Sequence, residues 1–107
     1  MDIQEFKKKL KEKSESEEIQ DKELIYKKSL ERFDDIYSFI FMEELAELIQ
    51  AISKKERNIE DANYMLIEEI ADVEIILELL KKRWNIEAEI IQKAKEIKLE
   101  RLQDKQK

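Results

Sequence analysis

Neither glycine nor proline occurs in this chain of 107 residues. These two residues supply most of the tight turns that connect β-strands, so their absence argues against an all-β or an α/β fold. Charged residues make up 45% of the sequence and hydrophobic residues 42%, a balance typical of long amphipathic helices. The sequence therefore predicts an all-α protein, folded as an antiparallel bundle of four to five helices.

Apolar residues recur at helical spacing in five segments. The first is a short amphipathic helix marked by Ile3, Phe6 and Leu10, which a polar linker follows. Longer helices are predicted at about 21–33, at 36–54, from Asn58 to Arg83 and at 86–104. We assign Asn58 and Asn85 as the N-caps of the last two helices. We accordingly divide the chain into residues 1–20, a helix with its linker, and residues 21–107, the main domain.

The chain also contains no histidine and no cysteine. Their absence excludes Ser-His-Asp and Cys-His catalysis, the common zinc sites and the Glu-x-x-His ligands of di-iron bundles. Any bound metal must be held by oxygen atoms, which favours Mg²⁺ or Mn²⁺. Because no signal-peptide core and no run of 18 apolar residues is present, we expect a cytoplasmic protein that does not enter a membrane.

Two acidic pairs lie inside the predicted helices at 36–54 and 58–83. Glu44 and Glu47 form the first pair, and Glu69 and Asp72 form the second. Residues three apart share a helical face, so the two charges of each pair repel each other. No lysine or arginine lies three or four residues from any of the four, although the chain has 21 basic residues. A divalent cation bound between the two helices is the simplest compensation.

Charge is unevenly distributed along the chain. Residues 38–80 carry eleven acidic and three basic residues, whereas residues 81–107 carry five acidic and nine basic residues. An acidic segment that holds a cation and a basic segment that holds phosphates would suit a metal-bound polyphosphate. Ordinary solvated helix faces would produce the same asymmetry. The net charge of −6 argues against binding duplex nucleic acid.

The two acidic motifs resemble the ExxE and ExxD signature of the all-α nucleotide pyrophosphohydrolases. The sequence reads EELAEL from Glu43 and EEIADV from Glu68, and 21 residues separate Glu47 from Glu69. This superfamily includes the MazG-like proteins, the dimeric dUTPases and the dCTP pyrophosphatases, and the resemblance covers about residues 39–101. It implies a MazG-like fold for residues 21–107 and hydrolysis of nucleoside triphosphates to a monophosphate and pyrophosphate.

The resemblance also implies the roles of individual residues. Glu44, Glu47, Glu69 and Asp72 would be the Mg²⁺ ligands, and Glu47 or Glu43 would orient the attacking water. Lys95 and Arg101 match the family's lysine and arginine that reach the phosphates and sugar, and Lys98 is a further candidate phosphate ligand. The family's asparagine has no counterpart, because Leu99 stands there. Tyr37 and Phe41 are candidates for the wall against the base, with Phe33 and Trp84 as further candidates.

Family precedent suggests a homodimer, or a tetramer built from dimers, whose subunits complete each other's nucleotide pockets. The expected role is the clearing of surplus or non-canonical (d)NTPs. Two other readings stay open at this point. The acidic face could dock a basic partner in a non-catalytic helical interaction module, or the protein could bind nucleotides as a regulator without cleaving them.

Overall fold

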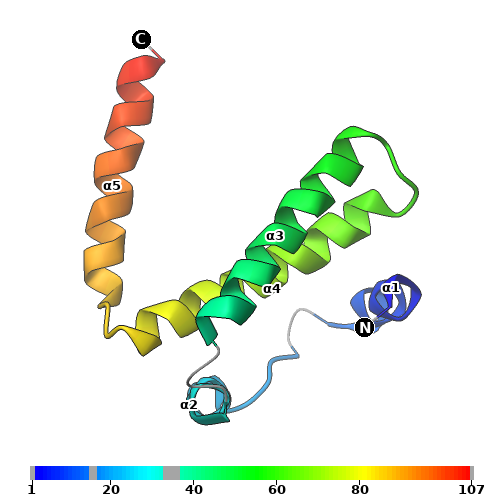
Figure 1. The fold of residues 1–107 in the computed structure, drawn as a ribbon, viewed down its shortest axis with the longest axis horizontal. Coiled ribbons are helices and arrows are strands. Elements are labelled where there is room, and N and C mark those ends of the chain that lie inside the picture. Colours follow the sequence, from blue (N-terminus) through cyan, green and yellow to red (C-terminus); the bar gives the residue numbers. More distant parts are fainter. Residues whose placement is uncertain (1, 15–16, 33–36, 107) are drawn as a thin grey trace. The chain divides into compact units, whose positions relative to one another are not determined.

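The structure is a computed structural model that describes residues 2–14, 17–32 and 37–106. The described residues form five α-helices and no strand (Figure 1), which confirms the predicted all-α class. The helices are α1 (Ile3–Glu12), α2 (Lys22–Arg32), α3 (Tyr37–Glu56), α4 (Ala62–Arg83) and α5 (Ala88–Lys105). None of them combines the length and the apolar character that crossing a membrane requires.

The chain divides into two compact units, Met1–Ile76 and Leu77–Lys107. The first unit contains α1, α2, α3 and most of α4, and the second contains the end of α4 and all of α5. All four predicted metal ligands belong to the first unit. The basic residues predicted to bind phosphates, all of them on α5, belong to the second.

In the first unit, α3 and α4 run antiparallel as a helical hairpin (Figure 1). Its buried side chains come from both helices, and they are Phe41, Ala51, Ala62, Val73 and Ile76. Two of these five are alanines, which allow close approach of the two helices but contribute little apolar area. The hairpin core is therefore small, and the polar side chains beside it matter more for stability than in a larger domain.

The end of α3 corrects one capping assignment. Asn58 has φ of 57°, in the left-handed region, and helix α4 begins only at Ala62. The backbone N–H of Asn58 donates to the carbonyl of Lys55 at 3.1 Å, and that of Ile59 donates to Lys54 at 3.1 Å. These two bonds are those of a Schellman motif, so Asn58 ends α3 instead of capping α4.

The end of α4 repeats this arrangement and corrects the second assignment. Asn85 has φ of 54°, its N–H donates to Lys82 at 3.4 Å, and the N–H of Ile86 donates to Lys81 at 2.8 Å. The N-cap of α5 is Glu87. Asparagine is favoured both at N-caps and in the left-handed conformation, and in a chain without glycine it takes the place that glycine usually occupies after a helix.

Replacing Asn58 with alanine is expected to lower the free energy of unfolding by about 1 kcal/mol, because a Cβ without a compensating polar group is strained at this φ. Asn63→Ala is the matched control, since Asn63 is exposed in the first turn of α4 and does not have a positive φ. Urea unfolding followed by circular dichroism measures both changes. Equal losses in the two variants would contradict the assigned role of Asn58.

Helix α1 is joined to the start of α4 by polar contacts. Asp61 accepts hydrogen bonds from Lys7 Nζ at 2.7 Å and from Gln4 Nε2 at 3.1 Å. Lys7 Nζ also lies 5.0 Å from the centroid of the Tyr64 ring. The hydrogen bond from Lys7 holds the pKa of Asp61 below its usual value. These contacts link residues of the N-terminal segment to the α3–α4 hairpin.

Candidate metal centre

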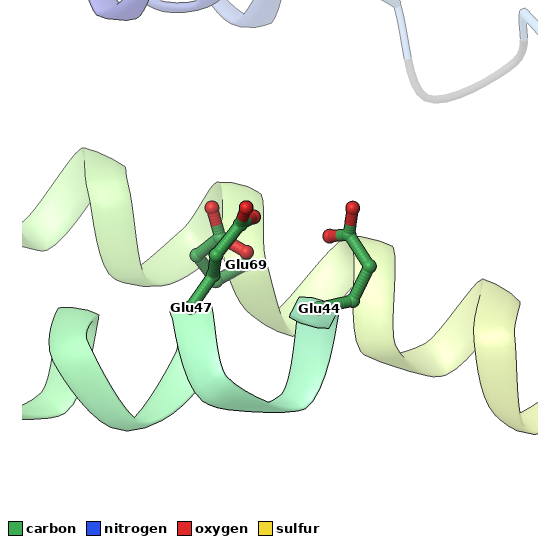
Figure 2. Close-up of side chains that lie close together, drawn as sticks. All are labelled: Glu44, Glu47 and Glu69. Atoms are coloured by element: carbon green, nitrogen blue, oxygen red, sulfur yellow. The ribbon is translucent and has the colours of Figure 1, made fainter. Parts of the chain in front are cut away.

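The hairpin brings together three of the four carboxylates predicted to bind a metal. Glu44 and Glu47 of α3 and Glu69 of α4 each place one carboxylate oxygen within 4.8 Å of the other two. Figure 2 shows these side chains extending to the same side of the hairpin, with the carboxylates of Glu47 and Glu69 next to each other. We call these three residues the glutamate cluster. Two oxygens that bind opposite sides of one Mg²⁺ lie about 4.2 Å apart and two neighbouring ones about 3 Å apart, so the three side chains would have to move closer together to share one ion.

The glutamate cluster has unsatisfied polar atoms. Glu44 and Glu69 are half-buried, and Glu47 is exposed. The Oε2 atoms of Glu44 and Glu69 are buried and have no hydrogen-bond partner among the described residues. A buried carboxylate oxygen without a partner is costly, and a bound cation would remove that cost. The all-oxygen donor set and these two orphaned oxygens fit a hard divalent ion such as Mg²⁺.

The pKa values of two glutamates of the cluster are raised above the ordinary value. Burial, followed by the negative charges of Glu47, Asp72 and Glu44, raises the pKa of Glu69 to about 7. Burial and the charges of Glu47 and Asp72 also raise the pKa of Glu44. Both causes disfavour the charged form, so they hold protons on the metal-free cluster. A cation that replaced these protons would bind more weakly as the pH fell.

Asp72 is not a member of the glutamate cluster, but it lies near it. It is half-buried, and burial followed by the charge of Glu47 raises its pKa. In turn, its charge contributes to the raised pKa values of Glu44 and Glu69. Asp72 therefore shares the electrostatic environment of the cluster and stays a predicted ligand.

No basic side chain neutralises these acids within the part of the chain that the structure describes. None of the four predicted metal ligands forms an ion pair with a described residue. The four predicted metal ligands therefore lack basic partners on their own helices and also among the other described residues. A cation from solution would compensate the charge.

The first glutamate of the EEIADV motif belongs to this environment as well, although sequence reasoning assigned it no role. Glu68 is half-buried, and burial followed by the charge of Asp72 raises its pKa. The sequence signal was the glutamate doublet, which repeats the doublet at Glu43. Glu43 itself is exposed on α3, and its charge contributes to the raised pKa of Glu44.

A cavity with a volume of about 340 Å³ adjoins the glutamate cluster. Glu47 and Glu69 lie in its wall, together with Glu68 and with Ile3 of α1. The volume falls within the usual range of small-molecule sites. The participation of α1 was not predicted, because nothing in the pattern of residues 1–20 indicates which surface that helix covers.

The predicted substrate-binding residues lie in several environments. Lys95, Lys98 and Arg101 are exposed on α5, where Lys95 and Lys98 border a shallow surface depression. Phe41 is only 2% exposed and packs in the hairpin core. Tyr37 begins α3, but its side chain, like Phe33, lies outside the described part of the chain. The Trp84 side chain is exposed near the end of α4.

Comparisons of this chain with protein-family models, with curated proteins and with solved structures gave no match. The two acidic motifs and the geometry of the glutamate cluster are therefore the features that indicate a function.

Proposed function

We propose that this protein is a Mg²⁺-dependent nucleoside triphosphate pyrophosphohydrolase with a MazG-like fold. The observation that supports this most directly is the glutamate cluster, in which carboxylates from two antiparallel helices approach within 4.8 Å without a basic partner among the described residues. The spacing of the two acidic motifs supports the same reaction class through the family resemblance.

The reaction would be an in-line displacement at the α-phosphorus. A water oxygen would bond to this phosphorus while the bond to the oxygen that bridges the α and β phosphates breaks, and pyrophosphate would leave. A bound Mg²⁺ would neutralise charge on the phosphate oxygens and make an attacking water more acidic. The glutamate cluster, with Asp72, would hold the ion. Because the chain has no histidine, the proton of the water would go to a carboxylate or to a metal-bound hydroxide, and Glu47 and exposed Glu43 are the candidates to orient the water.

The family resemblance also implies phosphate-binding residues on α5 and a second subunit. By the resemblance, Lys95 and Arg101 would reach the phosphates and the sugar, and Lys98 would be a further phosphate ligand. Exposed apolar side chains on α3 support an oligomer, since Met42, Ile49 and Ile52 are 56%, 68% and 48% exposed. Apolar surface of this kind marks contact surfaces. We therefore propose a homodimer or a tetramer, with the clearing of surplus or non-canonical (d)NTPs as its role.

A pyrophosphate-release assay over a panel of common and modified nucleotides tests the proposed activity. Turnover of at least one nucleotide is expected with millimolar Mg²⁺, and none is expected with excess EDTA. Chromatography should identify the nucleoside monophosphate as the second product, which distinguishes cleavage between the α and β phosphates from loss of the terminal phosphate. A folded protein that binds triphosphates but returns them intact would identify a regulator instead. A protein that neither binds nor cleaves any nucleotide would favour an interaction module.

A further inference from the structure

The cavity beside the glutamate cluster contains one cationic side chain. Its wall includes Glu47 and Lys54 of α3 and Glu69 of α4, with Ile3 of α1 and Met65 of α4 as apolar parts. Among the described residues that line the cavity, Lys54 is the only basic one. The cavity wall is therefore acidic at the glutamate cluster and carries the positive charge of Lys54 at another point. Ile3 and Met65 add apolar surface to it.

The C-terminal end of α3 favours a positive charge at Lys54, but no described side chain forms an ion pair with it. Lys54 lies in the last turn of α3 and is half-buried. Acidic residues nevertheless line the same cavity, including Glu47 and Glu69. An ammonium group without an ion-pair partner can bind an anion without first giving up an existing contact. The arrangement leaves Lys54 available to an anion that enters the cavity.

The position of Lys54 relative to the cluster indicates the kind of anion. Lys54 follows Glu47 by seven residues, so the two occupy the same face of α3, separated by about 10 Å along the helix axis. A cation held at the cluster would attract oxyanions, and lysine is a common phosphate ligand. A chain of linked phosphates can contact both Lys54 and a cation at the cluster, whereas a single phosphate is too short to span this separation.

We propose that Lys54 binds a polyphosphate group whose other end is attached to the cation held by Glu44, Glu47 and Glu69. This inference rests on the proposed metal site and extends it, because it assigns the cavity to a di- or triphosphate and adds a binding residue that the family resemblance did not supply. Met65 and Ile3 would border the phosphates on the apolar side of the cavity.

The test compares Lys54→Gln with Lys55→Gln in the full chain. Lys55 is the adjacent residue of α3, and it is exposed and does not line the cavity. Isothermal titration calorimetry first measures the binding of Mg²⁺ alone and then that of pyrophosphate or inorganic phosphate at saturating Mg²⁺. We expect Lys54→Gln to weaken pyrophosphate binding about tenfold, the effect of losing one charged hydrogen bond. Mg²⁺ alone should bind this variant at least as tightly, because a nearby positive charge has been removed.

Lys55→Gln should stay within about twofold of the parent protein in every titration, since an exposed charge outside the cavity contributes little. The parent protein should bind pyrophosphate more tightly than phosphate. Lys54→Arg, which keeps the charge, should retain most of the pyrophosphate affinity and so separates the loss of a contact from a folding defect.

The possible failures are distinguishable. If the parent protein binds Mg²⁺ but Lys54→Gln binds pyrophosphate as well as Lys55→Gln does, this inference is wrong and the metal site stands. Equal affinities for phosphate and pyrophosphate would also overturn the assignment of the cavity to a polyphosphate. If the parent protein does not bind Mg²⁺ at all, the proposed function fails, and this inference fails with it.

Discussion

Replacing Glu69 with glutamine is expected to lower the rate of Mg²⁺-dependent pyrophosphate release at least 100-fold, to about the background of the assay. Glu69 would supply an α4 oxygen of the metal site, and loss of a residue that merely orients a metal ligand already costs about 10–100-fold. A glutamine oxygen keeps the shape of the side chain but removes the charge that attracts the cation. Steady-state kinetics across a series of Mg²⁺ concentrations measures the loss.

The same substitution should raise the melting temperature in metal-free buffer. Glu69 carries one of the mutually repelling charges, and the strain on it is evident from its pKa of about 7. Millimolar Mg²⁺ should stabilise the parent protein by several degrees but have little effect on Glu69→Gln, since ligand binding stabilises only the state that holds the ligand. Differential scanning calorimetry with and without Mg²⁺ measures both effects.

Glu74→Gln is the matched control for this experiment. Glu74 is exposed on α4 and lies outside the glutamate cluster, so the same chemical change there should leave turnover and Mg²⁺ stabilisation close to those of the parent protein. Full activity in Glu69→Gln would rule out Glu69 as a metal ligand. Equal loss in both variants would point to a general effect of charge.

The metal-free protein should lose stability as the pH rises from about 5 to 8, although many proteins are most stable within this interval. The pKa of Glu69 is about 7 in the folded state, above the ordinary value of 4.5. Between these values the folded state binds more protons than the unfolded state, so the free energy of unfolding decreases with pH. The stabilisation is complete below pH 4.5 and is lost as the pH passes through 7.

Other carboxyl groups near the cluster change stability in the same direction. The pKa values of Glu44, Glu68 and Asp72 are also raised, mainly by burial. Because solvent screens these partly exposed groups, we expect a total decrease of about 1 kcal/mol over this pH interval. Asp61, whose pKa is lowered, loses its contribution only in more acidic solution, below its ordinary value of 3.8.

Urea unfolding at pH 5.5, 6.5, 7.5 and 8.5 in EDTA measures this pH dependence. Glu69→Gln should reduce the change of the free energy of unfolding with pH, while Glu74→Gln should leave that change as it is in the parent protein. Saturating Mg²⁺ should also reduce this change, because the cation then takes the place of the protons. A free energy of unfolding that increased with pH in metal-free buffer would show that the carboxylates do not repel one another in the folded state.

Both corrected capping assignments have the same origin. Asn58 and Asn85 stand between two helices each, and asparagine is suited equally to ending the helix before it and to starting the helix after it. The sequence contains no information that separates the two roles when both helices are expected. In the structure both residues end the preceding helix. Each has a positive φ, and the N–H of the next residue makes the closing hydrogen bond of the Schellman motif.

The sequence by itself determined that the chain is helical and that each acidic pair is isolated from basic residues on its own helix. Both properties depend on neighbours three and four residues away, which any reader of the sequence can identify. The tertiary structure alone decided which carboxylates approach across the hairpin, and it selected Glu44, Glu47 and Glu69 over Asp72. It also decided that Asp61 binds Lys7, 54 residues away, and that Ile3 lines the cavity. These contacts depend on the rotation of each helix about its axis, which is set by how side chains of distant segments pack together.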